Sequence, residues 1–389
     1  MQGRRVAITG IGALARCGIG AEHFWQGLLA PAPEGSRAIE DFDPQPWFDN
    51  PKQARRTDRF AQFALAAAEM ALTQAGAITA PSTRCGVIFG TGVGGLATLE
   101  DQIMTFHEKG PRRVSPFLVP MMMSNAGAAS ISMRHGWQGP CETTVTACAA
   151  GTHAIANAAR LISSGRCDAV ITGSSEAAMT PVGMQGFTNM TALSTSGVSR
   201  PFDARRDGFV MAEGAGALIL EDWDTAIARG ATILAEFLGG ASTADAHHIT
   251  APAPGGSGAV SCMQLALEEA GLQPSDIAQI NAHGTSTSLN DAAEADAIAQ
   301  VFGLPGPPVT STKGVTGHAL GAAGSLEAVA VVQSILTGVI PPTAGYGEPD
   351  PALATIDIVT EARTWVPGPT MSNSFGFGGH NGSLIISPA

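Results

Sequence analysis

Two segments far apart in the chain have the pattern of the same buried helix, and this repeat constrains the fold more than any other feature. Residues 149–165 (AAGTHAIANAARLISSG) and 322–338 (AAGSLEAVAVVQSILTG) both open with Ala-Ala-Gly and close with Gly at the same offset. Each follows a strand-like run, and the closing Gly is typical of a helix C-cap. Two Ala-rich helices can be alike by chance, but the repeated order of strand, turn, helix and strand favours two related halves.

Short apolar runs alternate with Ala-rich helical stretches, which predicts an α/β fold. Apolar residues recur at helical spacing over 58–74 and over 264–270. We place the divide between the halves near residue 240, which gives one half of 1–240 and another of 241–389. The expected strands are 5–9, 85–89, 143–147, 168–172, 215–220, 232–237, 278–282, 308–312, 355–359 and 383–387.

The composition argues against several classes of function. The net charge of −12 makes nucleic acid an unexpected partner. The first apolar run, 6–9, is too short for a signal peptide or a membrane span, so we expect a cytoplasmic protein. The six cysteines show no paired spacing, and the motifs C-x-x-C and H-E-x-x-H do not occur. Neither a disulfide framework nor a metal site is therefore expected.

Cys148 lies where a β-rich segment runs directly into the first of the two similar helices. We expect a sharp turn at the helix N-terminus, where free N–H groups and the helix dipole lower the pKa of a thiol. The same N–H groups suit an oxyanion. From this context alone, a nucleophile and a buried structural cysteine are about equally supported.

Two histidines lie at comparable turns. His283 follows the apolar region 277–280 and precedes Gly284 and a run of hydroxyl residues, whereas His318 opens the second similar helix. Either one could be a satisfied structural histidine. Their shared placement with Cys148 favours one catalytic site built from all three.

Glycine-rich segments leave other interpretations open. The segment 373–381 (NSFGFGGHN) allows close backbone approach and suits an oxyanion donor, an aromatic gate or a tight hairpin. The segments 10–15 and 90–95 resemble dinucleotide fingerprints, but no second strand ending in an acid follows the first. A dinucleotide-binding oxidoreductase is therefore a minor alternative.

In this order, the motifs TACAAG, NAHGTST, STKGVTGHALGAAG and NSFGFGG resemble the β-ketoacyl-acyl-carrier-protein synthases, in their elongating Cys-His-His branch. The resemblance covers nearly the whole chain. It implies a thiolase-like fold, with two similar α/β halves in a five-layered α-β-α-β-α arrangement. It also implies decarboxylative condensation of an acyl thioester with malonyl-acyl carrier protein, in fatty acid or polyketide elongation.

The resemblance also implies a role for each motif residue. Cys148 would hold the acyl chain, and the backbone N–H groups of Cys148 and Phe377 would form the oxyanion hole. His283 and His318, as neutral imidazoles, would stabilise the enolate that forms as CO₂ leaves. Lys313 and Glu327 would order the site electrostatically. Substrate would contact Thr285 and Thr287 through its pantetheine arm, Val93 and Phe187 in the acyl pocket, Phe375, and the gate Phe377.

The implied partner is an acidic acyl carrier protein, whose phosphopantetheine carries the substrates, and no separate cofactor is expected. A solvated face is the alternative to docking for the basic residues Lys52, Arg55, Arg56, Arg59, Arg112 and Arg113. A homodimer is implied, or a heterodimer with a related chain-length subunit in a type II polyketide or polyene system. The retained Cys148 argues that this chain is the catalytic member rather than a non-catalytic scaffold.

Overall fold

The computed structural model describes residues 3–389, and ten of the thirteen strands in these residues form two sets of five. The first set consists of β1 (Val6–Ala15), β3 (Cys85–Gly90), β4 (Cys141–Glu142), β5 (Ala169–Glu176) and β6 (Gly214–Asp222). The second consists of β7 (Ala235–Ala244), β8 (Gln279–Asn281), β9 (Val309–Thr310), β12 (Thr370–Gly376) and β13 (His380–Ser387). The short strand β2 (Gly18–Ile19) pairs with β1, and β10 (Val339–Ile340) pairs with β11 (Arg363–Thr364).

The two sets have the same topology. The first is ordered β4-β3-β5-β6-β1 and the second β9-β8-β12-β13-β7. In each set the first three strands are parallel, and the fourth strand runs antiparallel to its neighbours on both sides. The sets join where Val6–Ile8 of β1 pair with 235–237 of β7. The chain therefore consists of two similar α/β halves, as the thiolase-like fold requires.

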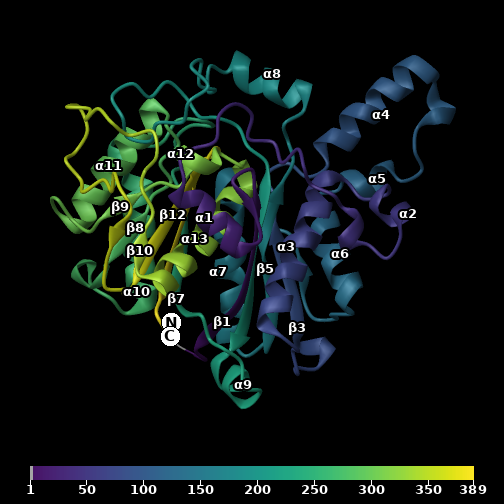
Figure 1. Cartoon of the computed structure of the whole chain (residues 1–389), viewed down its shortest axis with the longest axis horizontal. Coiled ribbons are helices and arrows are strands. Elements are labelled where there is room, and N and C mark those ends of the chain that lie inside the picture. The colour runs from purple at the N-terminus through teal and green to yellow at the C-terminus, as the bar shows by residue number, and fades with distance from the viewer. Residues whose placement is uncertain (1–2) are drawn as a thin grey trace.

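Helices complete five layers. The outer layer of the first half contains α3 (Arg59–Ala75) and α6 (Ala126–His135), and that of the second contains α10 (Ser257–Ala270) and α11 (Ser288–Phe302). Between the sheets lie α7 (Ala150–Ser163) and α13 (Ala323–Thr337), the two similar helices of the sequence. Figure 1 shows α7 and α13 at the centre, with α3 and α6 on one side and α10 and α11 on the other.

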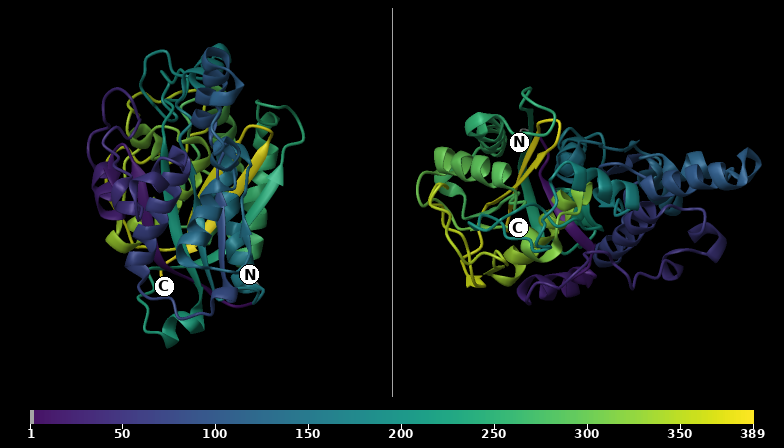
Figure 2. Two further views of the ribbon diagram at one scale, coloured as in Figure 1. Left: turned by 90° about the vertical axis from the view of Figure 1, so that its right-hand side faces the viewer. Right: turned by 90° about the horizontal axis from the view of Figure 1, so that it is seen from above.

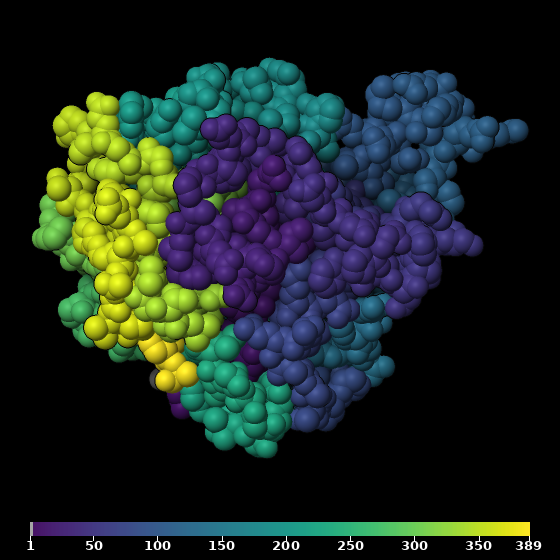
Figure 3. Space-filling model, viewed as in Figure 1, coloured from purple at the N-terminus to yellow at the C-terminus, as the bar shows by residue number. Residues whose placement is uncertain are grey.

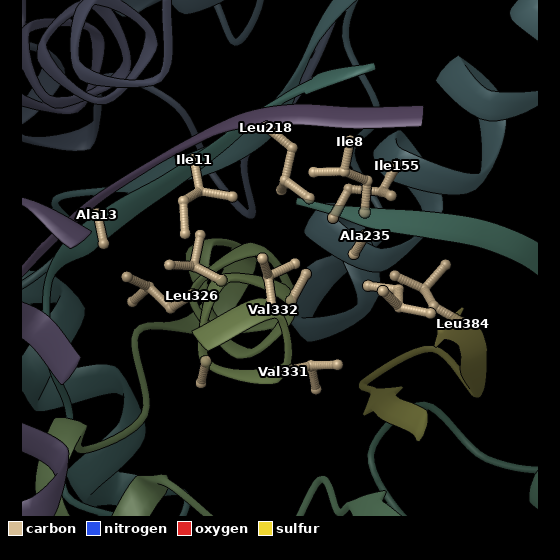
Figure 4. Close-up of a cluster of buried hydrophobic side chains, with 14 of the residues drawn as sticks. Ile8, Ile11, Ala13, Ile155, Leu218, Ala235, Leu326, Val331, Val332 and Leu384 are labelled. Carbon is tan, nitrogen blue, oxygen red and sulfur yellow. The ribbon is translucent and has the colours of Figure 1, made fainter. Parts of the chain in front are cut away.

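The middle layer is the most buried part of the molecule. In Figure 4, Leu326 and Val332 of α13 lie against Ile11 of β1, and Ile155 of α7 lies beside Ile8. Within the described residues, Leu320–Thr337 is the one stretch long and apolar enough to cross a membrane, but 83% of it is buried inside the protein. An apolar surface on nearly all sides suits a helix between two sheets.

Two glycines bring α7 and α13 into close contact. A Cβ added to Gly151 would lie 2.7 Å from the backbone N of Ser325, and one added to Gly324 would lie 2.8 Å from that of Thr152. Each helix is preceded by a 3₁₀ turn, η4 (Ala147–Ala149) or η7 (Leu320–Ala322). Both turns begin with a residue at positive φ, Ala147 at 49° and Leu320 at 44°. The repeat therefore extends to the turns that carry the candidate site.

The remaining helices lie around these layers. They are α1 (Ala21–Leu29), α2 (Pro51–Ala54), α4 (Leu96–Lys109), α5 (Leu118–Met122), α8 (Pro181–Asn189), α9 (Trp223–Ala228) and α12 (Lys313–Thr316). Figure 2 and the space-filling view in Figure 3 show α4 standing away from the body as an arm. Exposed Ile103, Met104 and Phe106 lie on this arm.

Three sequence expectations were wrong in detail. The segment 143–147 is not a strand, because the chain leaves the sheet after Glu142 and Thr144 accepts a hydrogen bond from the Thr91 N–H. The segment 355–359 makes only an isolated bridge between Ile358 and Val309. Strand β12 was missed, because its Ser and Asn residues lack the β-branched pattern of a typical strand.

The glycines of the first fingerprint-like segment serve packing. Gly10 and Gly12 lie inside β1, where an added Cβ would meet the carbonyl oxygens of Ala71 and Ala67 of α3 at 2.1 and 2.2 Å. Helix α3 thus occupies the space that a nucleotide phosphate would need. This geometry argues against the dinucleotide-binding alternative.

The close approach of β1 to α3 predicts a large loss of stability for Gly12→Ala, about 3 kcal/mol, because neither backbone has room to move. Gly186→Ala is the control, since Gly186 lies inside α8 with no atom near an added Cβ. Urea unfolding followed by circular dichroism measures both. Equal stability of the two variants would contradict this packing.

Candidate active site

Cys148 lies in the strained turn η4, immediately before α7. Its side chain is 7% exposed and lines a cavity of about 470 Å³. The backbone N–H groups of Phe377 and of Cys148 itself are directed at the sulfur. The expected turn at a helix N-terminus is therefore present, with two amide donors at the sulfur.

The two histidines meet at this sulfur. His318 Nε2 lies 3.0 Å from Cys148 Sγ. The rings of His283 and His318 have centroids 5.4 Å apart and meet edge to face. One His follows β8 and the other lies between α12 and η7, so the fold brings both loops of the second half against the turn of the first.

A buried ion pair lies behind the histidines. Lys313 Nζ forms an ion pair with Glu327 and also donates to the backbone oxygen of His283, at 2.5 Å. The same ammonium lies 3.3 Å from His283 Nδ1. An ammonium group only donates hydrogen bonds, so this contact makes Nδ1 an acceptor and places the ring proton on Nε2.

Burial determines the protonation states in the site. Desolvation lowers the pKa of both His283 and His318 well below the ordinary 6.5, and the Lys313 charge lowers them further. Desolvation also raises the pKa of the Cys148 thiol to about 12, against the opposing effects of Lys313 and the Phe377 N–H. The expected lowering of the thiol pKa was wrong, because burial outweighs the helix N-terminus.

The cavity brings together the residues predicted to contact substrate. Val93, Phe187, Thr285, Thr287, Phe375 and Phe377 all line it. The rings of Phe187 and Phe377 have centroids 6.5 Å apart, and Phe187 also packs edge to face against Phe209. The hydroxyls of Thr285 and Thr287 lie 2.9 Å apart. The lining is thus aromatic near Phe187 and rich in hydroxyl groups near Thr285.

Cys148, His283 and His318 are also a possible set of metal ligands, because their donor atoms lie within 4.8 Å of one another. A cation there would face the buried ammonium of Lys313. Repulsion between a metal cation and the Lys313 ammonium disfavours a metal ion between the three donor atoms. A neutral or anionic oxygen atom suits this position better.

Sequence analysis missed the buried carboxylates that hold the loops. Glu294 accepts the N–H groups of His283 and Gly284, both at 2.7 Å, and Asp291 accepts those of Thr285 and Ser286. Glu176 accepts the N–H groups of Gly92 and Gly321, at 2.6 and 3.0 Å. For Asp291, the available signal was an acidic residue in the first turn of a helix.

The predicted docking residues do not form one free cluster. Lys52, Arg55, Arg112 and Arg113 are exposed, and Arg56 stacks on Phe117 with its guanidinium 4.3 Å from the ring centroid. Arg59 instead makes a two-pronged ion pair with Glu213, at 3.0 and 2.6 Å. The charge of Arg59 is therefore paired with that of Glu213 next to β6, whereas the other predicted docking residues carry exposed side chains.

Family models match most of the chain. Residues 32–226 match the model described as beta-ketoacyl synthase, N-terminal domain, and residues 234–347 match beta-ketoacyl synthase, C-terminal domain. The chain is 42% identical over 414 residues to 3-oxoacyl-(acyl-carrier-protein) synthase 2 of Synechocystis, with 99% of this chain and 98% of the relative covered. The corresponding protein of Vibrio cholerae is 42% identical over 413 residues, with 99% of each chain covered.

Solved structures give the same result. The ishigamide ketosynthase/chain length factor superposes with a TM-score of 0.94 at 32% identity, over 100% of both chains. A beta-ketoacyl synthase from Burkholderia phymatum gives 0.92 at 34% identity, over 99% of this chain and 100% of the other. A type II polyketide acyl-carrier protein in complex with its ketosynthase gives 0.92 at 31% identity, over 100% of both chains.

The lowered pKa values predict that His283 and His318 stay neutral as the pH falls through 6.5 and become protonated only at lower pH. NMR titration of histidine-labelled protein measures this, with His283→Gln and His318→Gln assigning the signals. Lys313→Met removes a charge that opposes protonation, so both pKa values should rise while burial keeps them below 6.5.

Lys52→Met is the matched control for that experiment, because it removes the same charge from an exposed position. It should leave both titrations where they are. Protonation of either ring above pH 6.5 in the unsubstituted protein would contradict the assignment of neutral imidazoles.

Proposed function

The chain belongs to the β-ketoacyl synthase family of condensing acyltransferases, and on this premise we propose which of its residues perform decarboxylative condensation. The acyl group of a thioester is transferred to Cys148 and is then extended by malonyl-acyl carrier protein to a β-ketoacyl product. The observation that carries the proposal is the contact of 3.0 Å between Cys148 Sγ and His318 Nε2, beside His283.

In acyl transfer, the thiol attacks the thioester carbonyl as its proton moves to His318 Nε2. The raised pKa of Cys148 suits a proton transfer coupled to attack rather than a resting thiolate. The N–H groups of Cys148 and Phe377 donate hydrogen bonds to the developing oxyanion, and the carrier thiol leaves with the proton from His318. The product of this half-reaction is acyl-Cys148.

In condensation, the malonyl thioester oxygen lies against the Nε2–H of His283 and against Nε2 of His318. The neutral His318 ring, which had its proton on Nδ1 during acyl transfer, carries it on Nε2 in this step, so both rings donate. Breaking the bond to the carboxylate releases CO₂, and the electron pair forms an enolate held by these donors. The enolate carbon attacks the acyl carbonyl, and the Cys148 sulfur leaves. The contact between Lys313 and Nδ1 fixes the donor tautomer of His283, and Glu327 offsets the ammonium charge.

Mass spectrometry tests the first half-reaction. Incubation with acyl-acyl carrier protein should add one acyl group to a peptide containing Cys148, and Cys148→Ala should abolish it because the attacking sulfur is gone. Cys262→Ala is the matched control, since that thiol is buried in the core and lies outside the cavity. An adduct that persists in Cys148→Ala would refute the assignment.

We further propose that the substrates arrive on an acidic acyl carrier protein that docks near Arg112 and Arg113. Both side chains are exposed on η3 (Pro111–Arg113), at the end of the α4 arm, with Arg55 and Arg56 as further cations. The hydroxyls of Thr285 and Thr287 suit the amides of a pantetheine arm. The substrate needs no separate cofactor in this scheme.

Charge reversal tests the docking surface. Arg112→Glu and Arg113→Glu should each raise the KM for the carrier several-fold, with kcat preserved, because electrostatic attraction at a rim changes encounter more than chemistry. Arg166→Glu is the control, since it makes the same charge change on an exposed turn after α7. The surface is misassigned if all three variants have the same KM.

Fatty acid elongation is the pathway we favour, because the relatives at 42% identity are 3-oxoacyl-(acyl-carrier-protein) synthases. Elongation in a polyketide or polyene system, beside a non-catalytic chain-length subunit, is supported by the ketosynthase/chain length factor neighbours. We propose a cytoplasmic dimer in either case. The exposed edge strand β4 and the apolar residues of the α4 arm supply surface for a second subunit.

A further inference from the structure

His153 is a buried histidine that the reaction scheme above does not use. It lies in α7 and is 7% exposed. Its Nδ1 lies 2.9 Å from the hydroxyl oxygen of Thr146, and its Nε2 lies 2.9 Å from the backbone oxygen of Asn381. One ring therefore contacts the segment just before Cys148 and the segment just after the Phe377 loop.

The two contacts define one tautomer. A backbone carbonyl only accepts hydrogen bonds, so Nε2 carries the proton that is donated to Asn381. Burial lowers the pKa of His153, and the neighbouring His380 and Arg160 charges act in the same direction. The ring is therefore neutral, and its Nδ1 accepts a hydrogen bond from the Thr146 hydroxyl.

The segments that His153 joins carry the two amide donors at the sulfur. Cys148 N lies on the turn that follows Thr146, whereas Phe377 N lies on the loop between β12 and β13, which ends before Asn381. The segments are in contact, since a Cβ added to Gly376 would lie 3.0 Å from Cys148 N. Only non-covalent contacts hold the turn and the loop in their relative position. The turn is also strained, because Ala147 has a positive φ.

We propose that His153 is a positioning residue that sets the distance between the two donors of the oxyanion hole. It does so by holding Thr146 through Nδ1 and Asn381 through Nε2–H. This inference rests on the proposed function, because it assigns the Cys148 and Phe377 N–H groups to the thioester oxygen. A second hydrogen bond, between the hydroxyls of Thr152 and Ser374 at 2.7 Å, joins α7 to β12 but does not involve the turn that carries Cys148.

The test separates oxyanion-hole geometry from general stability. Acyl transfer to Cys148 uses the two amide donors, whereas malonyl decarboxylation in a Cys148→Ala background uses the histidine donors of the second half. His153→Ala should slow acyl transfer about tenfold or more, because small misplacements of donors have large effects on rate. Decarboxylation in the Cys148→Ala background should be unchanged by the same substitution.

Conservative variants sharpen the result. His153→Gln keeps an N–H donor near Nε2 and should recover part of the acyl-transfer rate. Thr146→Val removes the hydroxyl proton without changing the shape of the side chain, and should reproduce part of the loss even if His153→Ala does not fold. The double variant Thr146→Val/His153→Gln should lose less rate than the product of the two single losses, because the two residues act through one contact.

Ser334→Ala is the control for lost buried hydrogen bonds, since Ser334 in α13 donates to Gln279 and Val339 away from the cavity. It should lower the melting temperature without changing either rate. Equal losses of transfer and decarboxylation in His153→Ala, or no loss of transfer, would overturn the inference. Absence of an acyl adduct in the unsubstituted enzyme would instead overturn the proposed function, and this inference with it.

Discussion

The contact between α7 and α13 is the constraint on which the rest of the structure depends. Gly151 and Gly324 have no side chains, so the backbones of the two helices approach where any Cβ would collide. The turns before these helices are consequently brought face to face. One turn carries Cys148, and the other follows His318, so the contact between Cys148 and His318 is made between the two halves. The candidate site therefore lies at the junction of the two halves, on turns that belong to the same helices that form the core.

Burial of the site is the second constraint, because it determines which of the site residues carry a charge. The site holds its histidines neutral because protonation would place a cation in a buried cavity beside the Lys313 ammonium. The same burial makes a resting thiolate unfavourable. A neutral thiol beside a neutral imidazole is a state in which a proton can move without a net charge being created in the interior. Directly behind the histidines, the charges of the buried Lys313–Glu327 pair offset each other.

The sequence allowed the fold class to be predicted, and it singled out Cys148 and the two histidines that the structure brings together, because each belongs to a local pattern. Cys148 precedes a helix with a repeated motif, and His283 follows an apolar strand. The protonation state of Cys148 was predicted wrongly, because desolvation depends on neighbours such as Phe209 and Leu320 that are distant in sequence. Arg59 was grouped with the predicted docking residues from its place in the sequence, which does not show that Glu213 pairs with it from a distant strand end. Charge and burial are properties of the assembled protein, and a local pattern does not contain them.

The buried carboxylates explain how glycine-rich loops keep their shape around a reacting centre. Glu294, Asp291 and Glu176 each accept N–H groups from a loop that contributes to the cavity. A loop with such anchors retains its backbone direction without large side chains, which leaves the cavity free for substrate. Desolvation raises the pKa of Glu176 to about 7 and that of Glu294 to about 8. Burial therefore makes the ionised form of these two side chains less favourable than it would be in an exposed glutamate. The site therefore keeps its donors in place at some expense of folding stability, as expected where function rather than packing selects the residue.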